Sequence, residues 1–204
     1  NNNNNNSSSS SSDTRNDDEV VADLLCNSWF SRNRSSNDMK KGTKNEASVV
    51  NSLLCEPYIH DIWDVGLVAM RHYPFIGVSA DGVVDCCPPS SDNRTIATLE
   101  IKTKIAEQLK RLAEAVAVRH GHYFECSVGD SIWFQAVPRE YRGQVIQQAL
   151  VFGLDHAMFV VASVTRIFYS VLIRVSTAQR DMYLQSLLRY RHLLDWAHND
   201  SAVR

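Results

Sequence analysis

The sequence lacks any Cys-x-x-Cys pair, and its five cysteines are an odd number. These absences argue against a secreted disulfide framework and against a structural zinc site. The only cluster is Cys86-Cys87, and adjacent cysteines rarely bind one tetrahedral metal ion. We therefore expect reduced thiols without a metal-binding role.

Long hydrophobic runs are also missing. The longest apolar region, Met158 to Val175, is interrupted by Arg166 and is too polar to span a bilayer. The polar N-terminus shows no signal peptide. The net charge of −2 neither indicates nor excludes a nucleic-acid partner, because local charge distribution decides that. We expect a soluble intracellular protein, with a nuclear, mitochondrial or virus-derived context all left open.

The sequence does contain enough apolar residues for a core. With 204 residues, 44% of them hydrophobic, it suits one globular domain. Residues 1–18 are polar and begin with a pure Asn/Ser tract, which predicts a disordered tail. Apolar residues recur at helical spacing from about Glu19, so residues 19–204 are predicted to form a single domain.

A basic run, residues 31–44, follows the first of these apolar residues. Such runs are usually solvated loops. The alternative is a phosphate-binding lip formed by Lys40, Lys41 and Lys44, if a catalytic site lies beside it.

The next segment is typical of a helix that begins at Thr43. Thr43 and Glu46 have the spacing of a capping box, so Glu46 has an ordinary explanation as a helix cap. Glu46 also shares a helix face with Val49 and Leu53. A carboxylate on that inward face needs a partner, and a metal ion is one candidate.

Two strand-like stretches, "FIGVSADGVV" and "TIATLEIKTK", carry the other candidate residues. Asp81-Gly82 has an ordinary explanation as a hairpin turn between Val78 and Val83. Alternation places Glu100 and Lys102 on one face of the second strand, which has an ordinary explanation as a polar face in water.

The same residues fit a magnesium site. Hydrolysis of a phosphodiester uses divalent cations, and Mg²⁺ prefers carboxylate and carbonyl oxygens. Asp81 and Glu100 on adjacent strands can converge on one ion, with the Ile101 carbonyl as a further ligand. Lys102 would place a cation beside the attacking water or the scissile phosphate. Glu46 could complete the cluster.

These residues resemble the PD-(D/E)xK nuclease signature, in the branch that contains the phage lambda exonuclease and the YqaJ-type viral recombinases. "GVSADGVV" and "LEIKT" are similar to that branch's S-P-D-G and L-E-x-K motifs, with Ala80 where the branch usually has proline. "GTKNEASVVNSL" is similar to its G-T-x-x-E helix, and "VPREYRGQVIQQALVFGL" to its Y-x-x-Q-x-x-x-Q helix. The four motifs occur in the family order and span roughly two-thirds of the chain.

The resemblance implies an α/β fold with a restriction-endonuclease-like core, in which a central mixed β-sheet is flanked by α-helices. It implies Mg²⁺- or Mn²⁺-dependent hydrolysis of DNA, as an exonuclease acting on double-stranded ends in recombination or repair, and it allows a homo-oligomer. An alternative is an inactive nuclease-fold module that binds nucleic acid. The implied roles are these: metal binding by Glu46, Asp81, Glu100 and the Ile101 carbonyl; activation of water by Lys102; orientation of Lys102 or the substrate by Gln144 or Gln148; substrate binding by Lys40, Lys41, Lys44 and Gln148.

The remaining sequence predicts further helices and strands. A helix is expected over residues 105–120, a strand pair over 124–136, a helix over 139–152 that Gly153 ends, strands over 158–165 and 167–175, and a helix over 181–196. His120 and His122 lie too close together to form a zinc site without further ligands.

Overall fold

The computed structural model describes the backbone of residues 36–103 and 107–201, and the side chains of residues 45–103 and 110–196. The described residues from Lys41 onward form one compact unit. The predicted tail, residues 1–18, and the predicted domain start near Glu19 lie outside the described residues. None of the described helices is long and apolar enough to cross a membrane.

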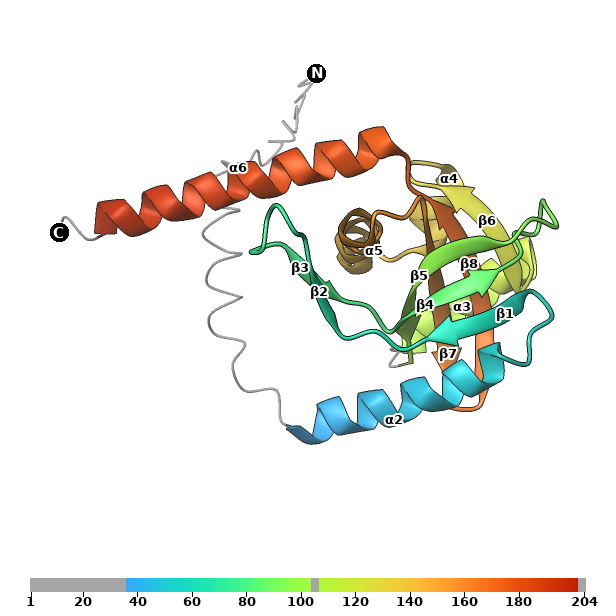
Figure 1. The fold of residues 1–204 in the computed structure, drawn as a ribbon. Helices are drawn as coiled ribbons and strands as arrows, with labels where there is room; N and C mark the ends of the chain where they lie inside the picture. The colour runs from blue at the N-terminus through green and yellow to red at the C-terminus, as the bar shows by residue number, and fades with distance from the viewer. Residues whose placement is uncertain (1–35, 104–106, 202–204) are drawn as a thin grey trace, which may run out of the picture. The chain divides into compact units, whose positions relative to one another are not determined.

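A six-stranded mixed sheet forms the centre of this unit (Figure 1). Only two neighbouring pairs, β5–β7 and β6–β8, are parallel. The predicted α/β fold with a central mixed sheet flanked by helices is therefore confirmed. In spatial order the strands are β1 (Ile59–Trp63), β4 (Gly82–Cys86), β5 (Thr95–Lys102), β7 (His156–Ser163), β8 (Arg166–Arg174) and β6 (Tyr123–Ser127).

Both faces of the sheet are covered, so its central strands are buried on both sides. Alternate residues of β7 belong to two different hydrophobic clusters, as the two-residue period of a strand requires. The first cluster receives side chains from α3 (Glu107–His120), α4 (Ser131–Ala136) and α5 (Arg139–Phe152). The second receives Val49 and Leu53 from α2 (Ser36–Leu53).

Two local predictions are wrong. Helix α2 begins at Ser36 rather than Thr43, so the segment with Lys40, Lys41 and Lys44 is helical and Glu46 lies well inside the helix. No proline interrupts this segment, and methionine and lysine are good helix formers. The predicted strand pair over residues 124–136 is strand β6 followed by helix α4, with Gly129 (φ 96°) at the turn between them.

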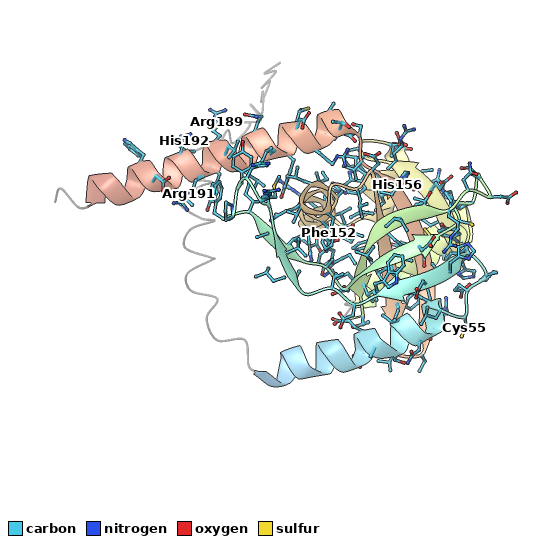
Figure 2. The ribbon with its side chains drawn as sticks, in the orientation of Figure 1. Cys55, Phe152, His156, Arg189, Arg191 and His192 are labelled. Atoms are coloured by element: carbon cyan, nitrogen blue, oxygen red, sulfur yellow. The ribbon has the colours of Figure 1, made fainter. Side chains whose placement is uncertain are left out.

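The other predicted helices and strands are confirmed with small changes in their ends. Helix α5 ends at Gly153, whose φ of 67° is the left-handed conformation expected after a helix. Helix α6 (Thr177–Ser201) is longer than predicted and carries Arg189, Arg191 and His192 in its second half (Figure 2).

A separate antiparallel hairpin consists of β2 (Leu67–Ala69) and β3 (Gly77–Ser79). It leads directly into Asp81 and β4. The ordinary explanation of Asp81-Gly82 as a hairpin turn therefore does not hold: β3 pairs with β2, whereas β4 pairs with β1 and β5. A type I′ turn would require a positive φ at Gly82. Gly82 is not among the described glycines that have a positive φ.

Gly82 is instead required by a close approach between strands. A Cβ atom at this position would lie 3.1 Å from the Trp63 carbonyl oxygen and 3.3 Å from Ile62 Cγ2. Both atoms belong to β1, whose backbone cannot move away without weakening its pairing with β4.

We expect Gly82→Ala to lower the free energy of unfolding by about 1–3 kcal/mol, the usual cost of overpacking. Gly66→Ala is the matched control, because a Cβ atom there meets nothing within 4 Å. The measurement is urea unfolding of both variants. Equal stabilities for the two variants would contradict the proposed close approach.

Candidate active site

The site lies where β5 extends beyond the start of β4. Gly82, the first residue of β4, pairs with Leu99, so β5 continues past the end of this pairing. Asp81 extends the ladder. Its backbone N–H donates to the Leu99 carbonyl (3.0 Å), and its Oδ2 accepts a hydrogen bond from the Ile101 N–H (2.6 Å). The Asp81 carboxylate thus accepts the hydrogen bond that a backbone carbonyl would accept if β4 continued along β5.

Glu100 lies beside Asp81 but faces the α5 side of the sheet. Its neighbour on β7, Phe159, belongs to the cluster that α5 covers. Only 2% of the Glu100 surface is exposed. One carboxylate oxygen forms an ion pair with Lys102, and the other accepts a hydrogen bond from Gln148 Nε2. Burial of a carboxylate is tolerated here because both of its oxygens have polar partners.

Lys102 lies at the open end of the site. Its side chain is 22% exposed, so the ammonium group is held near the surface. Its Nζ lies 4.6 Å from the centroid of the Tyr141 ring, which comes from the first turn of α5. A cation over an aromatic face is attracted by the ring quadrupole. Glu100 and Tyr141 therefore hold Lys102 from two sides.

The two carboxylates are destabilised in their charged form. Burial raises the pKa of Asp81, while the Ile101 N–H and the Lys102 charge oppose the rise. Burial also raises the pKa of Glu100, and the nearby Asp81 charge adds to this effect, while Lys102 and Gln148 oppose it. A further cation near this pair would stabilise both charges.

The donors at this position suit a hard divalent cation. Two carboxylates are available, and the Ile101 carbonyl points to the same edge of β5 as its N–H group, which faces Asp81. No group of three or more His, Cys, Asp or Glu side chains that could hold a metal occurs within the described part of the chain. One or two carboxylates completed by water and substrate oxygens are typical of Mg²⁺, whereas structural zinc takes four protein ligands.

Gln148 is the glutamine that reaches the site. It is fully buried and contacts Glu100, whereas Gln144 lies one turn earlier on α5 and is half-buried. The Oε1 atom of Gln148 is also a buried acceptor for which the described residues supply no donor. A water molecule or a ligand group at that point would satisfy it.

Glu46 does not join the two carboxylates in one cluster. It is half-buried on α2, whose Val49 and Leu53 pack in the cluster that contains Leu99 and Ile101. Helix α2 therefore covers the face of β5 opposite to the Glu100 side chain. The side chains of Lys40, Lys41 and Lys44 lie outside the described residues.

Tyr141 is the residue that the sequence did not assign to the site. It is the tyrosine of the Y-x-x-Q-x-x-x-Q pattern, and its spacing of seven residues from Gln148 places both on one face of α5. That spacing was the available signal, but only packing reveals that Lys102 lies against the ring.

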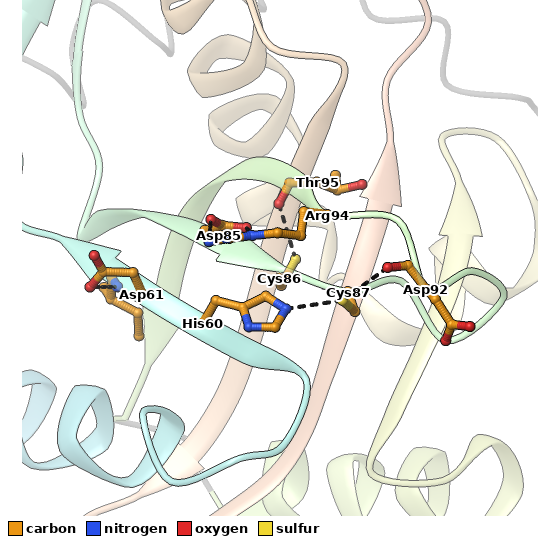
Figure 3. A network of polar contacts seen from close by, with 9 residues as sticks. His60, Asp61, Asp85, Cys86, Cys87, Asp92, Arg94 and Thr95 are labelled. Carbon is orange, nitrogen blue, oxygen red and sulfur yellow. Dashed lines mark hydrogen bonds and ion pairs between the residues drawn. The ribbon is translucent and has the colours of Figure 1, made fainter.

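A second polar cluster lies near the opposite end of β5 (Figure 3). Asp85 is on β4, and it is buried in an ion pair with Arg94. Cys87 Sγ lies 3.0 Å from His60 Nε2. The four described cysteines are free thiols, as predicted.

Comparisons with known proteins give a fold but no family. No family model matches the chain, and no curated protein matches it. The crystal structure of LHK-Exo in complex with dAMP is similar to this chain, with a TM-score of 0.55 and 17% identity, over 94% of this chain and 88% of that one. The crystal structure of an alkaline exonuclease (LHK-Exo) from Laribacter hongkongensis has a TM-score of 0.52 and 16% identity, over 91% of this chain and 84% of that one. At these identities the likeness establishes a shared fold.

The raised carboxylate pKa values predict a pH-dependent stability. Because the folded pKa of Asp81 exceeds its unfolded value of about 3.9, the folded state keeps this proton to higher pH. The stability that Asp81 contributes is therefore lost as the pH rises from the unfolded pKa through the folded pKa. Asp81→Asn removes this loss and still offers an oxygen to the Ile101 N–H.

We expect the free energy of unfolding of Asp81→Asn, relative to wild type, to increase as the pH rises above about 4. The measurement is urea unfolding without divalent cations between about pH 3.5 and 8. Asp64→Asn is the matched control, because Asp64 is exposed. A constant difference between Asp81→Asn and wild type across this range would contradict the interpretation.

Proposed function

We propose that this chain is a Mg²⁺- or Mn²⁺-dependent nuclease that hydrolyses DNA phosphodiester bonds, acting as an exonuclease on double-stranded ends in recombination or repair. The observation that carries the proposal is the convergence of Asp81, Glu100 and Lys102 at the open end of β5. The fold shared with an alkaline exonuclease supports it. The neighbouring structure that contains dAMP supports a nucleotide substrate.

Asp81, Glu100 and the Ile101 carbonyl are the proposed metal ligands. A divalent cation bound there would supply Lewis acidity and a hydroxide nucleophile at neutral pH. Asp81 is suited to this role because the Ile101 N–H fixes its carboxylate on the edge of β5. Glu100 is suited because Gln148 fixes its rotamer from α5. Glu46 would take part through a metal-bound water rather than as a third member of the carboxylate cluster.

Lys102 is the proposed residue that stabilises the reacting phosphate and positions the attacking water. It lies on the same face of β5 as Glu100, and its side chain is partly exposed. A fixed positive charge beside a phosphate counteracts the negative charge that develops on its oxygens. In this proposal Lys40, Lys41, Lys44 and Gln144 are left for contacts with the DNA strand.

Metal binding can be tested without an activity assay. We expect millimolar Mg²⁺ or Mn²⁺ to raise the unfolding temperature of the wild type, since ligands that bind only the folded state stabilise it by about 2.7 kcal/mol at one hundred times Kd. Asp81→Asn and Glu100→Gln should show a much smaller rise. Asp92→Asn, an exposed loop aspartate, should respond like the wild type. Equal responses of all four proteins would exclude this metal site.

Cleavage is tested with linear duplex DNA in Mg²⁺ or Mn²⁺, with closed circular DNA alongside. We expect the wild type to release nucleotides from the linear DNA only, and Lys102→Ala and Asp81→Asn to be slower by about 100-fold or more, as when one stabilising group is removed from an active site. Asp92→Asn should cut within about twofold of wild type, as expected for a surface change away from the site.

Other outcomes of this assay would change the proposal. Cutting of the circular DNA would replace exonuclease by endonuclease activity. If the wild type cuts neither DNA, or if both site variants cut as fast as it does, the catalytic proposal fails. A gel shift in Ca²⁺ would then identify an inactive nucleic-acid-binding module.

A further inference from the structure

A groove of about 230 Å³ lies between the β2–β3 hairpin and helix α6, apart from the carboxylate pair. Its floor is apolar, because Ile76 is buried at the tip of the hairpin and two leucines of α6 face it. Its walls are aromatic, and Arg191 lies at its rim. The lining includes Phe75, Ile76, Leu187, Tyr190, Arg191 and Leu194.

The aromatic walls are presented to solvent in a fixed position. Half of the Phe75 surface is exposed, and Tyr190 is half-buried. The hairpin tip is closed by backbone hydrogen bonds from Met70 to Ile76 (2.9 Å) and from Ile76 to Tyr73 (2.8 Å). The Arg191 guanidinium lies 5.4 Å from the centroid of the Phe75 ring. An exposed large aromatic residue held beside a cation is typical of a binding surface.

The charge around the groove is mostly positive. The hairpin segment 67–80 and the α6 segment 182–194 contain no Asp or Glu, but they contain five basic residues. On α6, Arg191 lies on the hairpin side, whereas Arg189 and His192 lie on the opposite side of the helix (Figure 2). One acid adjoins the surface, since Arg191 Nε donates to Asp195 (3.0 Å). The five are Arg71, His72, Arg189, Arg191 and His192.

Helix α5 links the groove to the candidate active site. Gln147 lines the groove, and its Nε2 donates to the Gly77 carbonyl of the hairpin (2.9 Å). The next residue, Gln148, contacts Glu100. From the other side, β3 ends at Ser79, two residues before Asp81. Helix α5 and strand β3 thus each connect the groove to the carboxylates.

We infer that the groove binds single-stranded nucleic acid, with one base stacked between Phe75 and Tyr190 and the flanking phosphates bound by Arg71 and Arg191. Aromatic walls accept any base through its flat face, and a positive rim follows the phosphate backbone. The groove is too small for a duplex, so its occupant is an unpaired segment. That this segment belongs to the substrate rests on the proposed function; the binding itself does not.

The test is binding of fluorescein-labelled oligothymidylate to the full chain in metal-free buffer, measured by fluorescence anisotropy. Phe75→Leu and Tyr190→Leu keep apolar volume but lose the ring, and each should weaken binding by about 5-fold or more, the loss of one stacked base. Arg191→Ala should lower the steepness of the salt dependence, because one fewer phosphate is contacted. Met182→Ala is the control, an exposed apolar residue of α6 outside this groove.

Binding and cleavage are separated by measuring both on the same variants. If the wild type and Met182→Ala bind oligothymidylate and the ring variants do not, the groove is supported even where no protein cuts DNA, and only the proposed function fails. If the ring variants bind within about twofold of wild type while folding normally, the inference is overturned. It is also overturned if the ring variants convert an oligomer into monomers and leave oligonucleotide binding unchanged.

Discussion

The burial of a charged carboxylate inside a two-sided sheet is the constraint on which this structure depends. Glu100 lies on the central strand β5, where both faces are covered and water cannot solvate it. Such a group must be paired from within the protein. The requirement fixes Lys102 on the same strand face and Gln148 on α5, and it places α5 against this part of the sheet. The electrostatics of the site thus follow from its position in the fold.

The open end of the site arises because β5 extends further than β4. Because β4 starts opposite Leu99, the last residues of β5 have no β4 backbone to pair with on that edge. Asp81 supplies its side chain in place of a backbone carbonyl. This arrangement needs the chain to arrive from the β2–β3 hairpin and to enter β4 at once, where Gly82 lets it pass close to β1. Metal ligation at this end would use oxygens whose positions the sheet already determines.

The sequence could predict which residues share a face, but not which face is buried. Alternation along β5 correctly placed Glu100 and Lys102 together. It could not show that this face lies under α5, because that depends on Gln148, which is 48 positions away in the chain. The same limit applies to Asp81-Gly82. The local turn preference of this pair suggested a hairpin, but both residues pair with β5, which comes later in the chain. Gln144 and Gln148 are also indistinguishable by spacing, since only helix packing decides which of them reaches the sheet.

Helix α5 contacts both regions because of its own geometry. Consecutive residues of an α-helix are turned by about 100° around its axis, so Gln147 and Gln148 point in different directions. One holds the hairpin through Gly77, and the other holds Glu100. A rotation of α5 would therefore alter the hairpin beside the groove and the carboxylate at the same time. If the groove holds the unpaired strand, strand binding and the orientation of Glu100 have a common support in α5.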